Sequence, residues 1–481
     1  MSRPVAPVAY PEVLAAAPGA GPAELLAELA ERAITVETGA RQRAEHARDW
    51  WPPSIPEASA GRVERWPGAV ARPRSSEEVA AVLAACARHH VPLTPQGGRS
   101  GVVDGATPVT GGLALDLTAL DRVLAIDPVS QLVRVEAGVF GPDLEAALEP
   151  HGLTTGHFPQ SFEISTVGGW VSCRGAGQFS TRYGKVEQRV RGLRVALLDG
   201  RLVDLGGRGP HPATGPDLVG LFVGAEGTLG VITEVTLALT RRARHRASAA
   251  RLFDTFDEGL EACRRALQRG ARPAVLRLYD EAESRRSFGL EGCALIVLDE
   301  GDEGLVQATL AIVDEECARA ERLDESVVAT WLERRNDVSA LASLWGAGVV
   351  VDTIETVAPW RVLGPLAHSV RAALEAVPAM VLASVHQSHA YEDGACLYFT
   401  FAGRPDSDPR AFHRAAWDAA LDAIVAAGAA VSHHHGVGRQ RVAHQVRTSA
   451  AAHELLVGLK TLLDPEGLLN PGVLGLGREV R

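Results

Sequence analysis

The pattern of hydrophobic and polar positions becomes regular at Trp66. Residues 68–101, GAVARPRSSEEVAAVLAACARHHVPLTPQGGRSG, predict a strand, a helix, a second strand and a glycine-rich turn. Ser75 or Ser76 is the candidate N-cap of this helix. Glu77 and Glu78 follow in its first turn, where the helix dipole favours negative charge. The same kind of alternation continues to residue 242, and predicts an α+β or α/β domain over 66–242.

Composition shifts at TRRARHRASAA, residues 240–250. Beyond this segment, helices rich in Ala, Glu and Arg alternate with strand-like runs, which predicts a second domain over 243–430 with helices packed on one sheet. Residues 1–65 are expected to form a helical lead-in that packs on a domain. Residues 431–481 are expected to form a tail that packs back on the first domain.

The length and charge of the chain exclude several classes of protein. A chain of 481 residues is too long for a single core, and a net charge of -11 leaves no basic surface for nucleic acid. Only Lys185 and Lys460 are lysines, so bound anions must be held by arginine, histidine or backbone N–H groups. No apolar run reaches the ~18 residues of a membrane span, and the six cysteines lack a CxxC spacing. We therefore expect a cytoplasmic protein without an integral membrane segment and with free thiols.

Three glycine-rich segments lie beside predicted strands of the first domain. They are TPQGGRSGVVDG at 94–105, PQSFEISTVGGWVSCRGAGQFSTRYGKVE at 159–187 and GAEGTLGVITEVTL at 224–237. None matches the P-loop or GxGxxG pattern. Backbone N–H groups of such turns converge on phosphates, so three of them suit an extended ligand such as a dinucleotide.

These segments resemble the FAD-binding domain of the vanillyl-alcohol-oxidase (PCMH-type) flavoproteins, which include FAD-linked D-lactate and glycolate dehydrogenases. The phrases IETVAPW, DGACLYFTF and SHHHGVG are more specific, and are similar to the alkyldihydroxyacetonephosphate synthases of this family. The resemblance runs from about residue 66 to the C-terminus. It implies an α+β fold, with a PCMH-type FAD-binding domain and a second α/β substrate (cap) domain of antiparallel sheet and helices.

The resemblance also implies that FAD is the cofactor and assigns its contacts to the glycine-rich segments. The pyrophosphate would be wrapped by Pro95, Gln96, Gly97, Gly98, Arg99, Ser100 and Gly101. Further contacts would come from Gln160, Ser161, Glu163, Ser165, Thr166, Gly169, Cys173, Arg174, Gly175, Ala176, Glu226, Gly227, Thr228, Gly230, Val231 and Ile232. Some family members bind FAD covalently through a histidine in the first turn. No histidine lies between Pro95 and Gly105, so we predict non-covalent FAD.

On the substrate side, the resemblance implies a catalytic set of Tyr398, Arg277 and the triplet His433, His434 and His435. Tyr398 would donate and accept a proton during flavin N5 chemistry at a carbon next to a carbonyl. A phenol with an ordinary pKa near 10 needs help to act as a base, which the histidines would supply. Alternative interpretations are a core tyrosine at 398, a surface ion pair at 277 and a loop without function at 433–435.

One position departs from the family pattern. Leu341 stands where the synthases carry an arginine that holds the substrate phosphate, and leucine cannot bind phosphate. Either Arg334 or Arg335 replaces that arginine, or the anionic small-molecule substrate carries no phosphate.

A metal site is the other interpretation of the histidine triplet. On a strand, His433 and His435 would share one face, and His386 or His389 could complete the site. The zinc-binding relatives use a different ligand pattern, so we expect no metal. Two other functions stay open: an FAD-linked oxidase or dehydrogenase of a 2-hydroxy acid or alcohol, and a flavin-binding protein without catalysis. A homodimer formed through the substrate domain is a further possibility.

Overall fold

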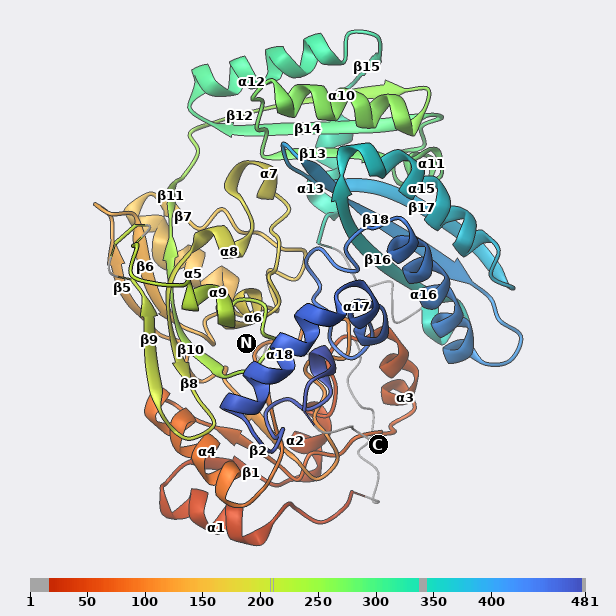
Figure 1. Ribbon diagram of the computed structural model, residues 1–481. Helices are drawn as coiled ribbons and strands as arrows, with labels where there is room; N and C mark the ends of the chain where they lie inside the picture. The colour runs from red at the N-terminus through yellow and green to blue at the C-terminus, as the bar shows by residue number, and fades with distance from the viewer. Residues whose placement is uncertain (1–16, 208, 211, 337–343, 478–481) are drawn as a thin grey trace.

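The computed structural model describes residues 17–207, 209–210, 212–336 and 344–477. Figure 1 shows an N-terminal half built on two sheets, a C-terminal half built on one large sheet, and tail helices that lie across the front between them. The mixed helix and sheet architecture predicted from the sequence is confirmed.

The first sheet has four strands in the order β1-β2-β4-β3, with β2, β4 and β3 parallel. Helix α4 (Ser76–Arg88) connects β2 to β3, and the Ser75 hydroxyl accepts a hydrogen bond from the N–H of Glu78, which confirms the predicted cap. Its apolar face packs between this sheet and the second one. The other elements of this region are α1 (Ala23–Glu31), β1 (Thr35–Glu37), α2 (Ala40–Glu45), α3 (Ile55–Ser59), β2 (Ala69–Arg72), β3 (Leu93–Gln96) and β4 (Leu113–Asp116).

The second sheet is antiparallel, with five strands in the order β5-β6-β10-β8-β9. Its core packs against short helices, of which α6 belongs to the second glycine-rich segment and α9 precedes the third. The strands are β5 (Val123–Asp127), β6 (Leu132–Glu136), β8 (Val190–Ala196), β9 (Leu202–Gly206) and β10 (Val231–Ala238). The helices are α5 (Gly141–Leu148), α6 (Val167–Ser172), α7 (Ser180–Tyr183), α8 (Val186–Arg189) and α9 (Leu218–Phe222), and a short ladder joins β7 (Leu153–Thr154) to β11 (Thr240–Arg241).

The C-terminal half is a seven-stranded antiparallel sheet in the order β15-β12-β14-β13-β17-β18-β16. Its strands are β12 (His245–Phe253), β13 (Val275–Tyr279), β14 (Cys293–Gly301), β15 (Glu321–Leu323), β16 (Val350–Pro359), β17 (Met380–Ala390) and β18 (Gly394–Gly403). One face, which we call the outer face, is covered by α10 (Phe256–Gln268), α12 (Glu303–Glu316), α15 (Trp360–Glu375) and α16 (Pro409–Ala426). The opposite, inner face is turned toward the N-terminal half and also contacts α7, α11 (Glu281–Phe288) and α13 (Ser326–Arg334).

Side chains alternate between these two faces along each strand, as the pleat requires. On β18, Leu397, Phe399 and Phe401 are fully buried in the outer core. Tyr398 stands between them in sequence and therefore points to the inner face. The same alternation on β13 sends Arg277 to the inner face while its neighbours Leu276 and Leu278 join the outer core.

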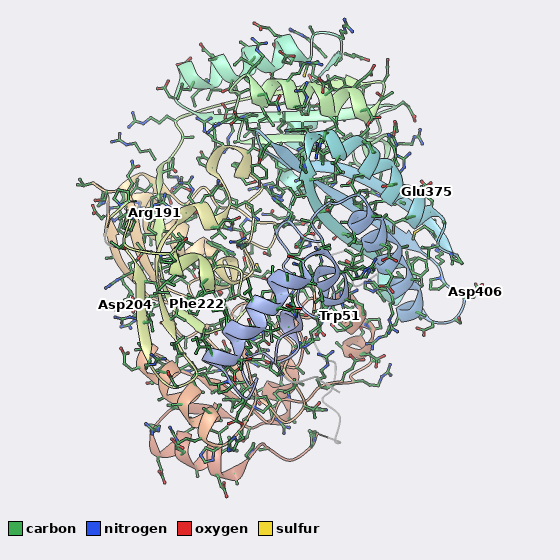
Figure 2. The ribbon with its side chains drawn as sticks, viewed as in Figure 1. Trp51, Arg191, Asp204, Phe222, Glu375 and Asp406 are labelled. Carbon is green, nitrogen blue, oxygen red and sulfur yellow. The ribbon has the colours of Figure 1, made fainter. Side chains whose placement is uncertain are left out.

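The tail returns from the large sheet to the N-terminal half. It starts with Ala430 paired to Val357 of β16, continues through α17 (Val442–Thr448) and α18 (Ala450–Leu463), and pairs Leu469 with Leu93 of β3. Trp51, labelled in Figure 2, contacts the segment just before α17, because its Nε1 donates to Oε1 of Gln440 at 3.1 Å. Among the described helices, none combines the length and apolar character needed to cross a membrane.

The histidine triplet does not lie on a strand. Residues 431–438 form an irregular loop, which we call the histidine loop, so the strand alternation assumed for His433 and His435 is wrong. The loop contains Gly436 and Gly438 with φ of 84° and 54°, a backbone conformation that a strand does not contain.

Candidate active site

The three glycine-rich segments meet in the N-terminal half. A Cβ on Gly98 would lie 1.9 Å from the carbonyl oxygen of Ile164, so the first segment can pack on the second only with glycine there. The third segment joins the second through a hydrogen bond of 2.9 Å from the N–H of Glu226 to the carbonyl of Ser172. Gly227 in turn lies against the Pro95 ring, because its Cβ would stand 3.0 Å from Pro95 Cγ. The turns thus form one continuous surface.

This surface fits a bound dinucleotide. The Arg99 side chain is 4% exposed, and its Nη1 atom lies 3.8 Å from Asp116 Oδ2 in an ion pair. Its Nε and Nη1 atoms have no hydrogen-bond partner among the described residues. Unfilled hydrogen bonds on a buried guanidinium are costly, whereas a pyrophosphate would fill them. Arg99, Arg174 and Glu226 hold positive φ values of 55°, 54° and 47°, strain that tends to occur where a ligand is bound.

The predicted cofactor residues fall into different environments. Gln160 and Glu163 are exposed, whereas Val231 and Ile232 are buried in β10 as part of the apolar cores. The Thr166 hydroxyl caps α6 by accepting from the N–H of Gly169 at 3.3 Å. These residues shape the segments, and direct contact with FAD stays a prediction for them.

Tyr398 lies in a row of inner-face residues that crosses neighbouring strands. It pairs in register with Glu355 of β16 and with His386 of β17. Its ring stacks on His386 with centroids 5.0 Å apart, and its hydroxyl lies 2.9 Å from Oγ1 of Thr353. Burial raises the pKa of the Tyr398 phenol above its usual value. The phenol is therefore neutral and can give a proton to a reacting group.

Arg277 and Glu283 hold His386 from two sides. Arg277 Nη2 donates to His386 Nε2 at 2.6 Å, and His386 Nδ1 donates to Oε1 of Glu283 at 3.1 Å. Burial lowers the pKa of His386, although Glu283 opposes the shift. Burial would raise the pKa of Glu283, but the His386 ring and two arginines keep it below its usual value. The arrangement is a neutral imidazole between a carboxylate and a guanidinium.

The histidine loop is held by two carboxylates, one from each half: Glu355, which is fully buried, and Glu226, which is half-buried. Glu355 Oε1 accepts from the N–H groups of His434 and His435 at 3.1 and 2.7 Å, while Oε2 accepts from Arg441 Nη1 at 2.5 Å. Glu226 Oε1 and Oε2 accept from the N–H groups of Val437 and Gly438 at 2.7 and 2.9 Å. These contacts place the rings of His434 and His435 6.1 and 5.8 Å from the Tyr398 ring.

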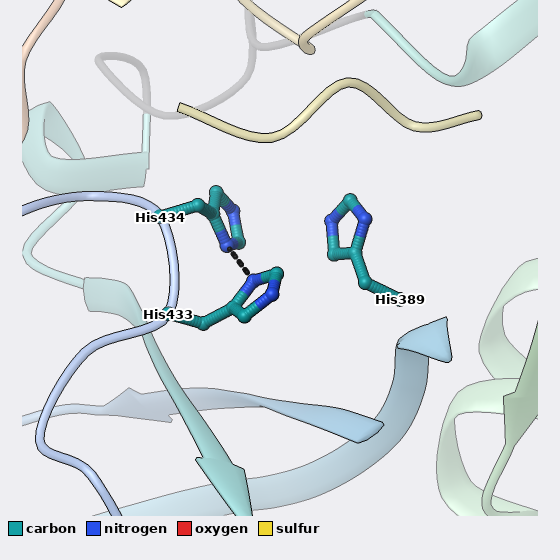
Figure 3. Close-up of side chains that lie close together, drawn as sticks. All are labelled: His389, His433 and His434. Atoms are coloured by element: carbon teal, nitrogen blue, oxygen red, sulfur yellow. Dashed lines mark hydrogen bonds between the residues drawn. The ribbon is translucent and has the colours of Figure 1, made fainter. Parts of the chain in front are cut away.

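His433 and His434 meet His389 of β17 in one histidine cluster (Figure 3). His433 Nδ1 lies 3.0 Å from His434 Nδ1, and a ring nitrogen of each of the three residues lies within 4.8 Å of the others. Burial lowers the pKa of all three well below the usual value, and Lys185, whose Nζ donates to the His433 carbonyl, adds to the shift. The imidazoles are therefore neutral.

Two further residues that the sequence analysis did not identify bind this cluster. Ser180 Oγ lies 2.7 Å from His389 Nδ1 and 3.3 Å from the Tyr391 hydroxyl. The Tyr391 hydroxyl lies 3.0 Å from His433 Nε2. Tyr391 follows His389 by two residues in the motif HAYEDG, which was a usable signal, whereas Ser180 lies in the second glycine-rich segment, far from His389 in sequence.

A second arginine lies near Arg277. The guanidinium groups of Arg277 and Arg335 lie 5.4 and 5.8 Å from the centroid of the Trp331 ring. Arg335 Nη1 donates to Oε1 of Gln178 at 2.5 Å, whereas Arg334 is exposed. Of the two candidates to replace the missing arginine, Arg335 therefore faces the site. Leu341 itself lies outside the described residues.

The sequence matches two family models, the FAD binding domain over 67–206 and the C-terminal domain of FAD linked oxidases over 242–474. An uncharacterized FAD-linked oxidoreductase, YgcU of Escherichia coli, is 30% identical over 430 residues, which cover 85% of this chain and 89% of that protein. Alkyldihydroxyacetonephosphate synthase of Caenorhabditis elegans is 29% identical, over 85% of this chain and 76% of the synthase. Glycolate oxidase subunit GlcD of Bacillus subtilis is 26% identical, over 88% and 94%.

A solved structure of alkyldihydroxyacetonephosphate synthase superposes on 96% of this chain and 88% of its own with a TM-score of 0.80, at 23% sequence identity. At that identity the superposition shows the fold alone, which confirms the predicted PCMH-type architecture with a second domain. FAD is the cofactor, as predicted. The chain belongs to the FAD-linked oxidase family of flavoproteins and is an FAD-dependent enzyme.

Proposed function

We propose that this flavoenzyme carries out chemistry of the alkyldihydroxyacetonephosphate synthase type on an anionic small molecule. The observation that supports it most is the position of Tyr398. Its neutral phenol lies between His386 and the histidine loop, and is held by Thr353. A proton donor and acceptor with neutral bases on both sides suits a reaction in which a proton leaves a substrate carbon and returns to it.

Arg277 and Arg335 are the proposed anion site. The two guanidinium groups lie 5.4 and 5.8 Å from the centroid of the Trp331 ring, and Arg277 Nε has no hydrogen-bond partner among the described residues. Planar guanidinium donors bind phosphate and carboxylate in pairs of hydrogen bonds. This arrangement supports an arginine-held anionic group on the substrate.

The bound FAD supplies the electron-accepting centre next to the substrate carbon. The protein holds the anion with arginines, moves the proton with Tyr398 and binds substrate oxygens with His434 and His435. The net substitution is redox-neutral. The carbon–oxygen bond to an acyl group breaks, a bond to an alcohol oxygen forms, and the alcohol proton leaves with the carboxylate.

The anaerobic visible spectrum of the holoenzyme tests this function. Acyl dihydroxyacetone phosphate is expected to bleach the flavin bands, and a long-chain alcohol is expected to restore them without oxygen. Tyr398→Phe is the matched variant, because it should retain flavin while losing the bleaching. Recovery that requires oxygen or another electron acceptor would contradict a redox-neutral substitution.

A second candidate function is oxidation of a 2-hydroxy acid or alcohol. The pairing of His386 with Glu283 favours it, because a carboxylate behind an imidazole supports removal of a hydroxyl proton. Arg277 beside this histidine would hold the carboxylate of a hydroxy acid. Under this function a hydroxy acid or alcohol alone bleaches the flavin, and the acyl compound does not.

A further inference from the structure

We propose that Ser180 and Tyr391 couple the protonation of His389 to that of His434, so that one histidine offers a base to the substrate whenever the other offers a proton. The chain of contacts runs from His389 Nδ1 to Ser180, then to Tyr391, His433 and His434 Nδ1, over 2.7, 3.3, 3.0 and 3.0 Å. Together these residues form the proton chain. The use of this chain in turnover rests on the proposed function, whereas its coupling does not.

Counting protons shows why the two ends are coupled. Three neutral imidazoles and two hydroxyl groups carry one mobile proton each. Each of the contacts along the chain needs one proton between its two atoms, which leaves a single proton for the two outer nitrogens. That proton sits on Nε2 of His389 or on Nε2 of His434, never on both.

The two outer nitrogens, Nε2 of His389 and Nε2 of His434, lie close to each other. The rings of His389 and His434 have centroids 5.0 Å apart, and the chain uses Nδ1 of each, which leaves Nε2 as the outer atom (Figure 3). The His434 ring also lies beside Tyr398. A substrate at this place would meet one acceptor and one donor at the same time.

The chain can move a proton without charging a buried group for long. When the outer nitrogen of one histidine takes a proton, each member passes its own proton to the next, and the other histidine releases one. In the proposed substitution, the entering alcohol would give its proton to one end, and the departing carboxylate would take one from the other end. Lys185 lies next to His433 and disfavours a lasting imidazolium in the cluster.

Nitrogen-15 NMR of the holoenzyme labelled in its histidine rings tests the coupling directly. His389→Gln and His434→Gln assign the two signals. In the wild type we expect opposite tautomers, Nε2–H on one histidine and Nδ1–H on the other. Tyr391→Phe removes the middle of the chain, so the tautomers of the two histidines should become independent. Tyr183→Phe is the matched control, because its hydroxyl donates to Glu300 outside the chain and its loss should leave both tautomers unchanged.

Three results would overturn the proposal. They are the same tautomer on both histidines in the wild type, tautomers that Tyr391→Phe does not change, and a stoichiometric metal ion in the purified enzyme.

Turnover provides a separate measurement. Ser180→Ala and Tyr391→Phe should each slow the reaction at least 10-fold. The double variant should be no slower than either single variant, because both substitutions break the same proton chain. If no substrate bleaches the flavin but the tautomers of His389 and His434 are coupled, the proposed function is wrong and the coupling through the proton chain is still supported.

Discussion

Tyr398 and Phe399 are neighbours on β18 and lie in opposite environments. Phe399 is fully buried in the outer core, where helices α15 and α16 cover the sheet. Tyr398 lies on the inner face among histidines, threonine and carboxylate. The outer face therefore stabilises the sheet through apolar contacts. The inner face positions the polar groups that are proposed to bind the substrate and transfer its proton. Substitutions on the two faces should separate stability from turnover.

The largest separation is expected at this pair of residues. Tyr398→Phe should slow turnover by about 100-fold or more while the flavin stays bound, and should cost about 1 kcal/mol of stability from the lost contact with Thr353. Phe399→Ala should cost about 3–5 kcal/mol of stability and leave the turnover of the folded fraction near that of the wild type. Urea unfolding and anaerobic single-turnover spectra measure the two effects. Tyr398→Phe with wild-type turnover would contradict the proton-transfer role.

The next effect compares two buried acids of β16. Glu355 supports the histidine loop from the inner face, while Asp352 accepts from His413 and Trp417 of α16 at 2.7 and 2.9 Å on the outer face. Glu355→Gln and Asp352→Asn each break a buried network, at a cost of up to about 3–5 kcal/mol. Only the first should also slow turnover, because a neutral amide keeps one acceptor oxygen and cannot serve both Arg441 and the N–H groups of His434 and His435.

Ser432→Ala provides a milder version of the same test. Its hydroxyl donates to Glu355 Oε1 at 2.9 Å, so the substitution loosens the loop without leaving Arg441 unpaired. Equal loss of turnover in Glu355→Gln and Asp352→Asn, measured on the folded fraction, would show that the effect comes from general destabilisation.

The sequence was sufficient to predict features that depend on residues close together in the chain. The alternation in ACLYFTF and VLRLYD predicts strands, and it sends Tyr398 and Arg277 away from the apolar residues around them. The N-cap of α4 follows from Ser75 in the same way, because it depends on residues close in the chain. Local patterns were sufficient for these features.

The partners of the histidines could not be found from local patterns. Ser180 meets His389 across 209 positions of sequence, and Glu226 reaches the histidine loop across 211. Glu226 was predicted to contact the flavin from its motif, and the motif carries no sign of a contact with Val437. The metal interpretation of His433 and His435 assumed a strand, and local alternation could not distinguish that strand from the irregular loop that the structure contains. These contacts depend on how the two halves meet.

A smaller effect is expected from the two arginines at the end of α13. Arg335→Met removes a guanidinium that lies on Trp331 beside Arg277, and should raise the KM of an anionic substrate about 10- to 100-fold. Arg334→Met is the control, because Arg334 is exposed and the substitution should leave KM unchanged. Steady-state kinetics with a charged substrate and a neutral analogue measure the difference. An equal loss for both substrates would mean that Arg335 does not bind the anion.

The smallest effect concerns the pH dependence of stability through Glu226, which holds the histidine loop from the N-terminal half. Burial raises the pKa of its carboxyl to about 7, although the N–H groups of Val437 and Gly438 oppose the shift. Between the ordinary value of 4.5 and about 7, the folded protein keeps a proton that the unfolded chain has released. Stability must therefore fall as pH rises through this range.

Glu226→Gln removes this titration. Relative to the variant, the wild type should lose about 1–2 kcal/mol of unfolding free energy between pH 5 and 7, and the difference should be constant above pH 8. Urea unfolding of the two holoenzymes across this range measures it. Glu355 offers the opposite case, because Arg441 and His435 keep its pKa below the usual value despite burial. It stays ionised throughout this range, so Glu355→Gln should leave the slope between pH 5 and 7 unchanged. If Glu355→Gln altered the slope as much as Glu226→Gln, the two carboxylates would share one titration, and the loop would not be held independently from the two halves.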